Sequence, residues 1–260
     1  MNISDKLMER YGKPHLSYSS IKKALSDMAL FDLYMKGAIE YKSDALEFGT
    51  MYDMLLFERD KALKTYMVVD HDLIMERCSP TTQSTKSPKA TKEYKEVKDA
   101  IEIELAEKGK VACTKEDWKM ANEMIDRLVN SGVYQKFLSG RHQVEVYQEI
   151  NGVTVKGYID CLGDGYISDS KSSRSVDGFK YDVSKMCYDV QAYIYCKAMG
   201  IKTFYWVVQE KTYPFLPAVV KCTDQTLFAG EMKFLEAVSR ITKFVNGTSD
   251  PMEDYITFEV

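Results

Sequence analysis

The chain has 260 residues, of which 45% are hydrophobic and 28% are charged, as in an ordinary globular protein with one sizeable core. Its net charge of −4 does not favour a protein that coats nucleic acid indiscriminately, but it is compatible with a nuclease that has a local basic track. Because no apolar run could cross a bilayer and the N-terminus lacks a signal-peptide pattern, we expect a cytoplasmic protein without a membrane partner.

The N-terminal half of the sequence predicts helices. A first helix follows Ser17 or Ser19, either of which can be its N-cap, and it places Ile21 and Met28 at helical spacing. Residues 79–92 are rich in serine, threonine, proline and lysine, so they are predicted to form a flexible stretch. Further helices are predicted over 45–64, 91–108 and 115–138.

From Gln143 onward, apolar and polar residues alternate, which predicts strands. The strands are expected over 143–150, 153–161, 165–171, 204–209 and 218–221, with helices over 183–199 and 226–244. Helices that precede a meander of strands indicate a mixed α/β fold. We expect a single domain over 1–260, with a mostly helical part (1–140), a sheet with one helix (141–225) and a C-terminal helix and tail (226–260).

The most informative stretch joins two of these strands through the turn Gly163-Asp164-Gly165. Asp160 ends the strand before the turn, and Asp169 and Lys171 lie two residues apart on the strand after it. Residues i and i+2 of a strand point to one face, so the last two should project together. Two carboxylates and an ammonium make poor core packing, but they are typical of a site for a divalent metal and an activated water.

An acidic residue before a turn, then Asp-x-Lys, then a helix bearing Gln191, resembles the PD-(D/E)XK nuclease superfamily. More narrowly, the chain resembles the exonuclease VIII (RecE)-like and lambda-exonuclease-like branch of phage and prophage recombination nucleases. The segments that begin at Leu16-Ser-Tyr and Phe48-Gly-Thr also look like opening segments of that branch. The resemblance implies a restriction-endonuclease-like α/β core, with a central mixed sheet flanked by helices and a helical N-terminal part.

The resemblance also assigns roles at the site. Mg²⁺ or Mn²⁺ would be held by Asp160, Asp169 and the backbone carbonyl of Ser170. Lys171 would orient or deprotonate the attacking water and stabilise negative charge, and Gln191 would position the lysine, the water or the phosphate.

Other carboxylates are candidates for the metal. Relatives usually carry a histidine in the helix after the Gly-Thr motif, whereas the matching position here is Asp53, either a further ligand or a structural carboxylate. Glu145 is the best upstream ligand, and Glu149, on the same face of its strand, is the alternative.

Contacts with DNA are expected from two places. Lysines recur at positions 86, 89, 92, 95 and 98, either as a solvated surface or as a basic flap that contacts phosphates. Of these we select Lys86, Lys89 and Lys92 as DNA contacts. Tyr195, on the helix that bears Gln191, is either a further DNA contact or a core residue.

The expected function is therefore a metal-dependent deoxyribonuclease, which the resemblance narrows to a 5′→3′ exonuclease acting on double-stranded DNA ends in the bacterial host cytoplasm. The resemblance also implies a ring-shaped homo-oligomer and a single-strand annealing protein as partner. An endonuclease or nickase of the same fold is an alternative. A non-catalytic DNA-binding or assembly module is another, which the missing helix histidine keeps open.

Overall fold

The computed structural model describes residues 2–39 and 43–249. The chain divides into two units: unit 1 comprises residues 1–42 and 128–260, and unit 2 comprises residues 43–127. The expectation of one functional domain over the whole chain stays a prediction. In the described ranges, no helix has the length and apolar character that a membrane span needs.

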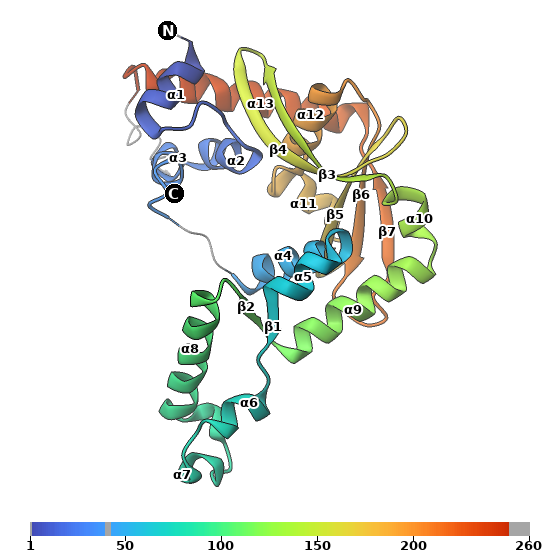
Figure 1. Cartoon of the computed structure of the whole chain (residues 1–260). Coiled ribbons are helices and arrows are strands. Elements are labelled where there is room, and N and C mark those ends of the chain that lie inside the picture. Colours follow the sequence, from blue (N-terminus) through green and yellow to red (C-terminus); the bar gives the residue numbers. More distant parts are fainter. Residues whose placement is uncertain (1, 40–42, 250–260) are drawn as a thin grey trace, which may run out of the picture. The chain divides into compact units, whose positions relative to one another are not determined.

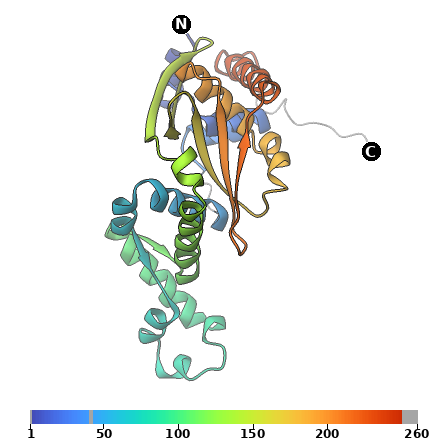
Figure 2. The ribbon, with the colours of Figure 1, turned by 90° about the vertical axis from the view of Figure 1, so that its right-hand side faces the viewer.

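Unit 1 is built around a mixed sheet (Figures 1 and 2), which confirms the predicted α/β fold. Its strands, within the described residues, follow the order β3-β4-β5-β6-β7, with β5 and β6 parallel and the other pairs antiparallel. The strands are β3 (Arg141–Ile150), β4 (Val153–Leu162), β5 (Ile167–Ser173), β6 (Phe204–Glu210) and β7 (Pro217–Lys221). The helices are α1 (Ile3–Tyr11), α2 (Tyr18–Ser26), α3 (Met28–Met35), α10 (Val133–Phe137), α11 (Phe179–Lys185), α12 (Tyr188–Met199) and α13 (Asp224–Val245).

Strands β4 and β5 pair only at one end. Their register joins Cys161 to Ser168 and Leu162 to Ile167, whereas β3 and β4 pair along their whole length. The part of β4 that β5 leaves unpaired bonds instead to the segment before α2. The Leu16 amide donates to the Thr154 carbonyl at 2.9 Å, and the Lys156 amide donates to the Leu16 carbonyl at 2.8 Å. The sheet is therefore split between β4 and β5, and α2 starts next to the split.

The residues of strand β4 that face the core do not keep a regular spacing of two along the strand. Val155 and Ile159 belong to the hydrophobic core of unit 1, but so does Leu162, three residues after Ile159. In a regular strand, residues three apart point to opposite faces, so regular alternation cannot bring both Ile159 and Leu162 to one face. The register places Gln143, with a φ of 50°, opposite Asp160, so an irregular backbone accompanies the change. Asp160 thus lies at the position where the core-facing side of β4 changes.

Several predicted helices are broken in the structure. The helix expected over 183–199 ends as α11 and restarts as α12, because Cys187 between them has a left-handed φ of 60°. The helix expected over 115–138 ends before Gly132, whose φ of 77° is also left-handed, and continues as α10. Ser17 caps α2 as predicted, but Asp27, in an extended conformation, ends α2 and caps α3.

Unit 2 is mostly helical and contains a small parallel sheet of β1 and β2. Its elements are α4 (Asp44–Phe57), α5 (Arg59–Thr65), β1 (Tyr66–Val68), α6 (His71–Glu76), α7 (Pro80–Gln83), the 3-10 helix η1 (Pro88–Ala90), α8 (Lys92–Glu107), β2 (Val111–Cys113) and α9 (Lys115–Asn130), which crosses the unit boundary. The predicted flexible stretch 79–92 contains α7 and η1 instead. The Glu93 carboxylate accepts bonds from the Ser79 amide and from the Ser79 and Thr82 hydroxyls, which anchors this stretch on α8.

Helices α12 and α13 approach each other closely at Gly230. A Cβ atom at this position would lie 2.1 Å from the Asp189 carbonyl oxygen of α12. We expect Gly230→Ala to lower the free energy of unfolding by on the order of 1–3 kcal/mol, because a backbone atom cannot yield as a flexible side chain can. Gly49→Ala in α4 is the matched control: nothing lies within 4 Å of its Cβ, so it should raise stability by about 0.5–1 kcal/mol. Urea unfolding measures both, and equal effects of the two changes would contradict the packing argument.

Candidate active site

The predicted carboxylates and lysine come together at the split between β4 and β5. Ser170 of β5 has no pairing residue on β4, and its amide donates instead to Asp160 Oδ2 at 2.9 Å. Asp169, only 1% exposed, forms an ion pair with Lys171 through Oδ2. On α12, Gln191 Nε2 donates to Asp169 Oδ1 at 2.9 Å. The structure thus joins five of the predicted site residues through direct contacts.

The Lys171 ammonium is held from two sides. Besides Asp169, its Nζ contacts the Ser170 carbonyl at 3.4 Å and lies 5.0 Å from the centre of the Tyr188 ring. That ring stacks on Phe179, with 5.7 Å between ring centres. A cation over an aromatic face is attracted to it, so Tyr188 supports the charged form of the lysine.

Burial and charge shift the pKa values of these groups. Burial raises the pKa of Asp160, and the nearby charge of Asp169 raises it further. Burial on its own would lower the pKa of Lys171, but the charges of Asp169 and Asp160 outweigh burial and raise it. Lys171 is therefore an ammonium here. The site gains a surplus negative charge when Asp160 ionises.

The oxygen atoms of the site suit a hard divalent cation. Asp169 Oδ2 is buried and paired with the Lys171 ammonium, which also contacts the Ser170 carbonyl. Among residues 2–39 and 43–249 no group of three or more histidine, cysteine, aspartate and glutamate side chains gathers as a metal site. The available ligands are thus the two aspartates, a carbonyl and water, a set that suits Mg²⁺, which keeps several of its waters.

The other predicted ligands have different surroundings. Exposed Glu145 forms an ion pair with Lys156 at 3.1 Å and accepts a bond from the Tyr158 hydroxyl at 3.2 Å, and these contacts hold its pKa below the usual range. Its charge is already balanced, so it is a weaker candidate than either aspartate. Its alternative, Glu149, is exposed. Asp53 lies partly buried in α4 of unit 2, and its role at a metal stays a prediction.

The predicted DNA contacts differ in exposure. Tyr195 is only 5% exposed, and its ring lies so close to Gly157 of β4 that a Cβ there would be 3.0 Å away. A ring this buried cannot stack on a base, so Tyr195 forms part of the wall of the site. Lys86, Lys89 and Lys92 are all exposed and all belong to unit 2, and Lys92 pairs with Glu96 at 3.3 Å.

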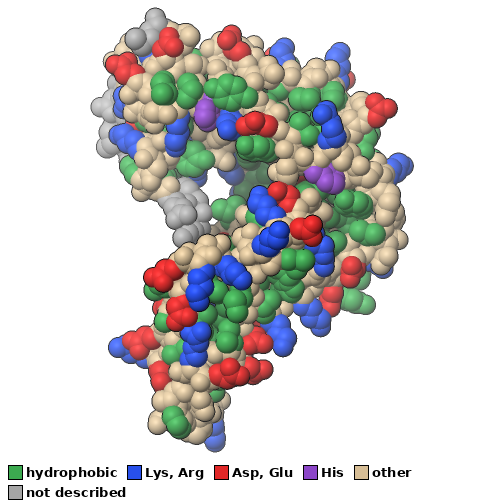
Figure 3. Space-filling view, in the orientation of Figure 1, with side chains coloured by type: hydrophobic (Ala, Val, Ile, Leu, Met, Phe, Trp, Pro, Cys, Tyr) green, Lys and Arg blue, Asp and Glu red, His purple; other side chains and the backbone are tan. Residues whose placement is uncertain are grey.

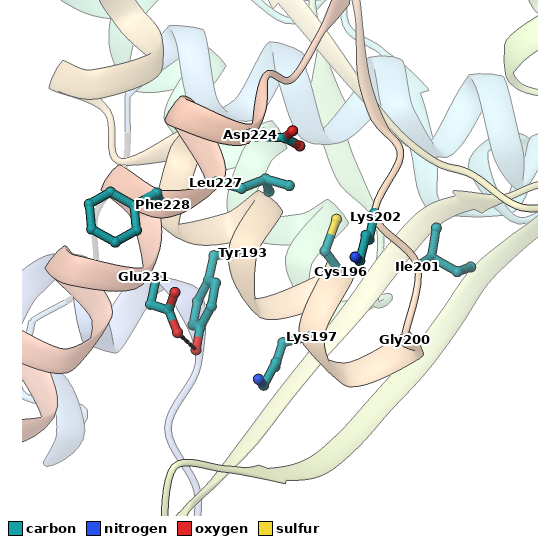
Figure 4. A pocket seen from close by; sticks show the side chains of 10 residues that line it. All are labelled: Tyr193, Cys196, Lys197, Gly200, Ile201, Lys202, Asp224, Leu227, Phe228 and Glu231. Carbon is teal, nitrogen blue, oxygen red and sulfur yellow. Dashed lines mark hydrogen bonds between the residues drawn. The ribbon is translucent and has the colours of Figure 1, made fainter.

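Sequence reasoning missed the part of Tyr188. A signal was available: Tyr188, Gln191 and Tyr195 are three and four residues apart, so they share one face of α12. The opposite face of this helix lines a hollow of about 450 Å³ against α13. Figure 4 shows Tyr193 and Glu231 joined there by a hydrogen bond of 3.2 Å. None of the site carboxylates lines that hollow.

A mixed sheet that carries these two aspartates and the lysine at its split defines a PD-(D/E)XK-type fold and site. The family described as "PDDEXK-like domain of unknown function (DUF3799)" matches residues 17–256, and the chain belongs to this family. The predicted superfamily is thereby confirmed. Among curated proteins, none has a significantly similar sequence.

One solved structure shows the same fold. A candidate exonuclease from Eubacterium rectale is similar with a TM-score of 0.63 and 19% sequence identity, over 98% of this chain and 92% of that one. Two others are more distant. An alkaline exonuclease from Laribacter hongkongensis has a TM-score of 0.35 and 11% identity, over 69% of this chain and 90% of that one. A phage-related exonuclease from Haemophilus somnus has a TM-score of 0.33 and 12% identity, over 64% and 90%.

The raised pKa of Asp160 makes the stability of the metal-free fold depend on pH. A carboxyl whose pKa is higher in the folded state ionises more readily in the unfolded chain, so stability falls as pH rises from the unfolded pKa, about 3.9, through the folded one. Asp160→Asn removes this penalty. With a chelator present at pH 8, we expect the variant to be more stable than the parent by about 1 kcal/mol or more, a difference that shrinks toward pH 4.

Urea unfolding at a series of pH values tests this expectation. The matched control is Asp164→Asn, which neutralises an exposed carboxyl in the turn of the same hairpin. A constant difference between parent and Asp160→Asn at every pH would show that Asp160 carries no such penalty.

Proposed function

We propose that this protein is a metal-dependent DNA nuclease that degrades double-stranded DNA from its ends in the 5′→3′ direction. The observation that carries the proposal is the meeting of Asp160, Asp169 and Lys171 at the sheet split, with Gln191 bonded to Asp169. Membership of a PDDEXK-like family supports hydrolysis of a phosphodiester. The exonuclease description of the Eubacterium rectale protein supports the exonuclease mode.

Each residue then has a chemical task. Bound Mg²⁺ or Mn²⁺ would supply charge neutralisation and a stronger water nucleophile, and Asp160, Asp169 and the Ser170 carbonyl would hold it. The Lys171 ammonium donates hydrogen bonds to oxygens on which negative charge develops. Because its pKa is raised, it acts as a donor, and not as the base that takes a proton from water. Gln191 fixes the orientation of Asp169, and Tyr188 fixes that of Lys171.

The wider context belongs to the same proposal. Double-stranded DNA ends are the substrate, a ring-shaped homo-oligomer is the assembly, and a single-strand annealing protein is the partner in recombination. The bacterial cytoplasm is the compartment. These assignments rest on the resemblance to phage recombination nucleases.

Removal of either central group tests the chemistry. We expect Asp169→Ala and Lys171→Ala each to reduce cleavage by on the order of a hundredfold or more, because each group acts on the charge of the transition state. The control Asp164→Ala, an exposed carboxyl in the preceding turn, should cleave like the parent. Cleavage is followed on linear, circular and end-labelled duplex DNA with Mg²⁺ or Mn²⁺, and circular dichroism checks folding.

The outcomes separate the candidate functions. Loss of label from linear ends with circular DNA intact supports the exonuclease. Cut circles identify an endonuclease or nickase. A parent protein that binds DNA but cleaves none with either metal is a non-catalytic module, and near-parental cleavage by folded Asp169→Ala overturns the assigned site.

The lysine-bearing segment of unit 2 is the proposed backbone contact. Figure 3 shows basic and acidic side chains interspersed over the visible face of this unit, and α8 itself pairs Lys92 with Glu96 and Lys98 with Glu102. Replacement of Lys86, Lys89 and Lys92 by glutamine should weaken binding to all sequences and flatten the dependence of affinity on salt, because fewer counterions are released. Sequence preference should not change, since phosphates carry no base information.

Fluorescence anisotropy over a salt series measures this effect. The matched control replaces three other lysines of unit 2, each already paired with an acidic residue: Lys61, Lys115 and Lys119. It removes the same charge. Equal losses in both triple variants would mean that the segment acts only through net charge, and no loss in the first would place the DNA track elsewhere.

A further inference from the structure

Helix α2 brings a second lysine to the catalytic split. The bridge between Leu16 and β4 fixes the start of the helix where β5 has left β4. Tyr18 is the first residue of α2, and Lys22 lies four residues later on the same face of the helix. The Tyr18 hydroxyl donates to the Met186 carbonyl, and Lys22 Nζ lies 3.8 Å from Met186 Sδ.

These contacts tie α2 to the start of the helix that supports the site. Met186 is followed by Cys187, the N-cap residue of α12, and then by Tyr188, whose ring lies under the Lys171 ammonium. Lys171 and Lys22 are close enough for each to feel the other's charge, and Tyr18 also feels the charges of Lys171 and Asp169. Lys22 is therefore a neighbour of the reacting groups, although it lies about 150 residues before them in the chain.

The charge of Lys22 has no counterion within residues 2–39 and 43–249. Among the residues that the structure describes, no carboxylate pairs with its Nζ, and its polar contact is a thioether. Burial lowers the pKa of Lys22. Nearby Cys187 acts in the opposite direction, and the positive charges of Lys23 and Lys171 lower the pKa further. A partly buried ammonium that is neither paired nor fully hydrated costs stability, so the fold alone gives no reason for it. An anion bound there would pair with the Lys22 ammonium and offset its repulsion from Lys171.

We propose that Lys22 binds a phosphate of the substrate strand next to the phosphodiester that is cleaved. The inference rests on the proposed function. A DNA strand carries a phosphate at every nucleotide, so with one phosphate at the aspartates and Lys171, an adjacent one can reach a neighbouring ammonium. Lys22 donates to its oxygens as Lys171 does to the reacting group, and the Tyr18 contact with Met186 holds α2 in register with α12.

Equilibrium binding without divalent cation tests Lys22 apart from catalysis. The full-length protein binds labelled duplex DNA in EDTA over a salt series. Lys22→Gln should weaken binding about tenfold or more and reduce the salt slope by about 1, and Lys22→Arg should restore both. The matched control is Lys36→Gln, which removes a lysine already paired with Asp32. Thermal unfolding should show Lys22→Gln to be at least as stable as the parent, because no carboxylate of the described residues pairs with the lost ammonium.

The DNA end identifies the source of the phosphate. If Lys22→Gln loses affinity only for duplexes with a 5′-phosphate and not for those with a 5′-hydroxyl, Lys22 holds the terminal phosphate. Equal losses with both ends place it on an internal phosphate. Unchanged affinity and salt slope overturn the proposal, as do equal losses in Lys36→Gln. A failed nuclease assay with intact Lys22-dependent binding would overturn the proposed catalysis and leave this contact standing.

Discussion

The separation of β4 from β5 is the constraint on which the rest of the site depends. Two strands that part leave backbone donors without a partner, and a buried amide without an acceptor costs on the order of 1–3 kcal/mol. Asp160 solves this locally by accepting from the Ser170 amide, and Leu16 solves it on the β4 side by bonding to residues 154 and 156. The same split that exposes the carboxylates therefore recruits the N-terminal segment and sets α2 beside them.

The split also concentrates charge that the fold does not need. Asp160 and Asp169 are forced close together in a poorly hydrated place, where Lys171 compensates only one negative charge. Such an arrangement costs stability compared with apolar packing, as buried ionic groups commonly do. Lys22 adds a positive charge nearby that no carboxylate of the described residues pairs. The aspartates of the sheet thus carry negative charge, and α2 carries positive charge, and neither is fully compensated within the site. This pattern is expected where a cation and a polyanion bind together.

The local parts of this site could be predicted from the sequence, and the distant parts could not. Alternation and turn residues gave the strands and the shared face of Asp169 and Lys171, because these depend on neighbours in the chain. The break at Cys187 was missed, since a left-handed conformation is uncommon outside glycine and nothing in the adjacent residues demands it. The Leu16 bridge and the place of Lys22 follow from contacts across more than 130 residues, which no local pattern records. The pairing of Glu145 with Lys156 could have been predicted, because the register of the hairpin makes them diagonal neighbours on adjacent strands.

Helix α12 transmits the constraint from the core to the chemistry. One face supplies the bond from Gln191 to Asp169, the ring under Lys171 and the packing of Tyr195 on Gly157. The other face is fixed to α13, where Gly230 allows backbone contact and Lys233 pairs with buried Asp189 at 2.7 Å. A helix locked on both faces cannot shift toward one partner without losing another. The orientations of the carboxylate and the ammonium are thus set before substrate arrives, which is the condition for electrostatic stabilisation of a transition state without reorganisation.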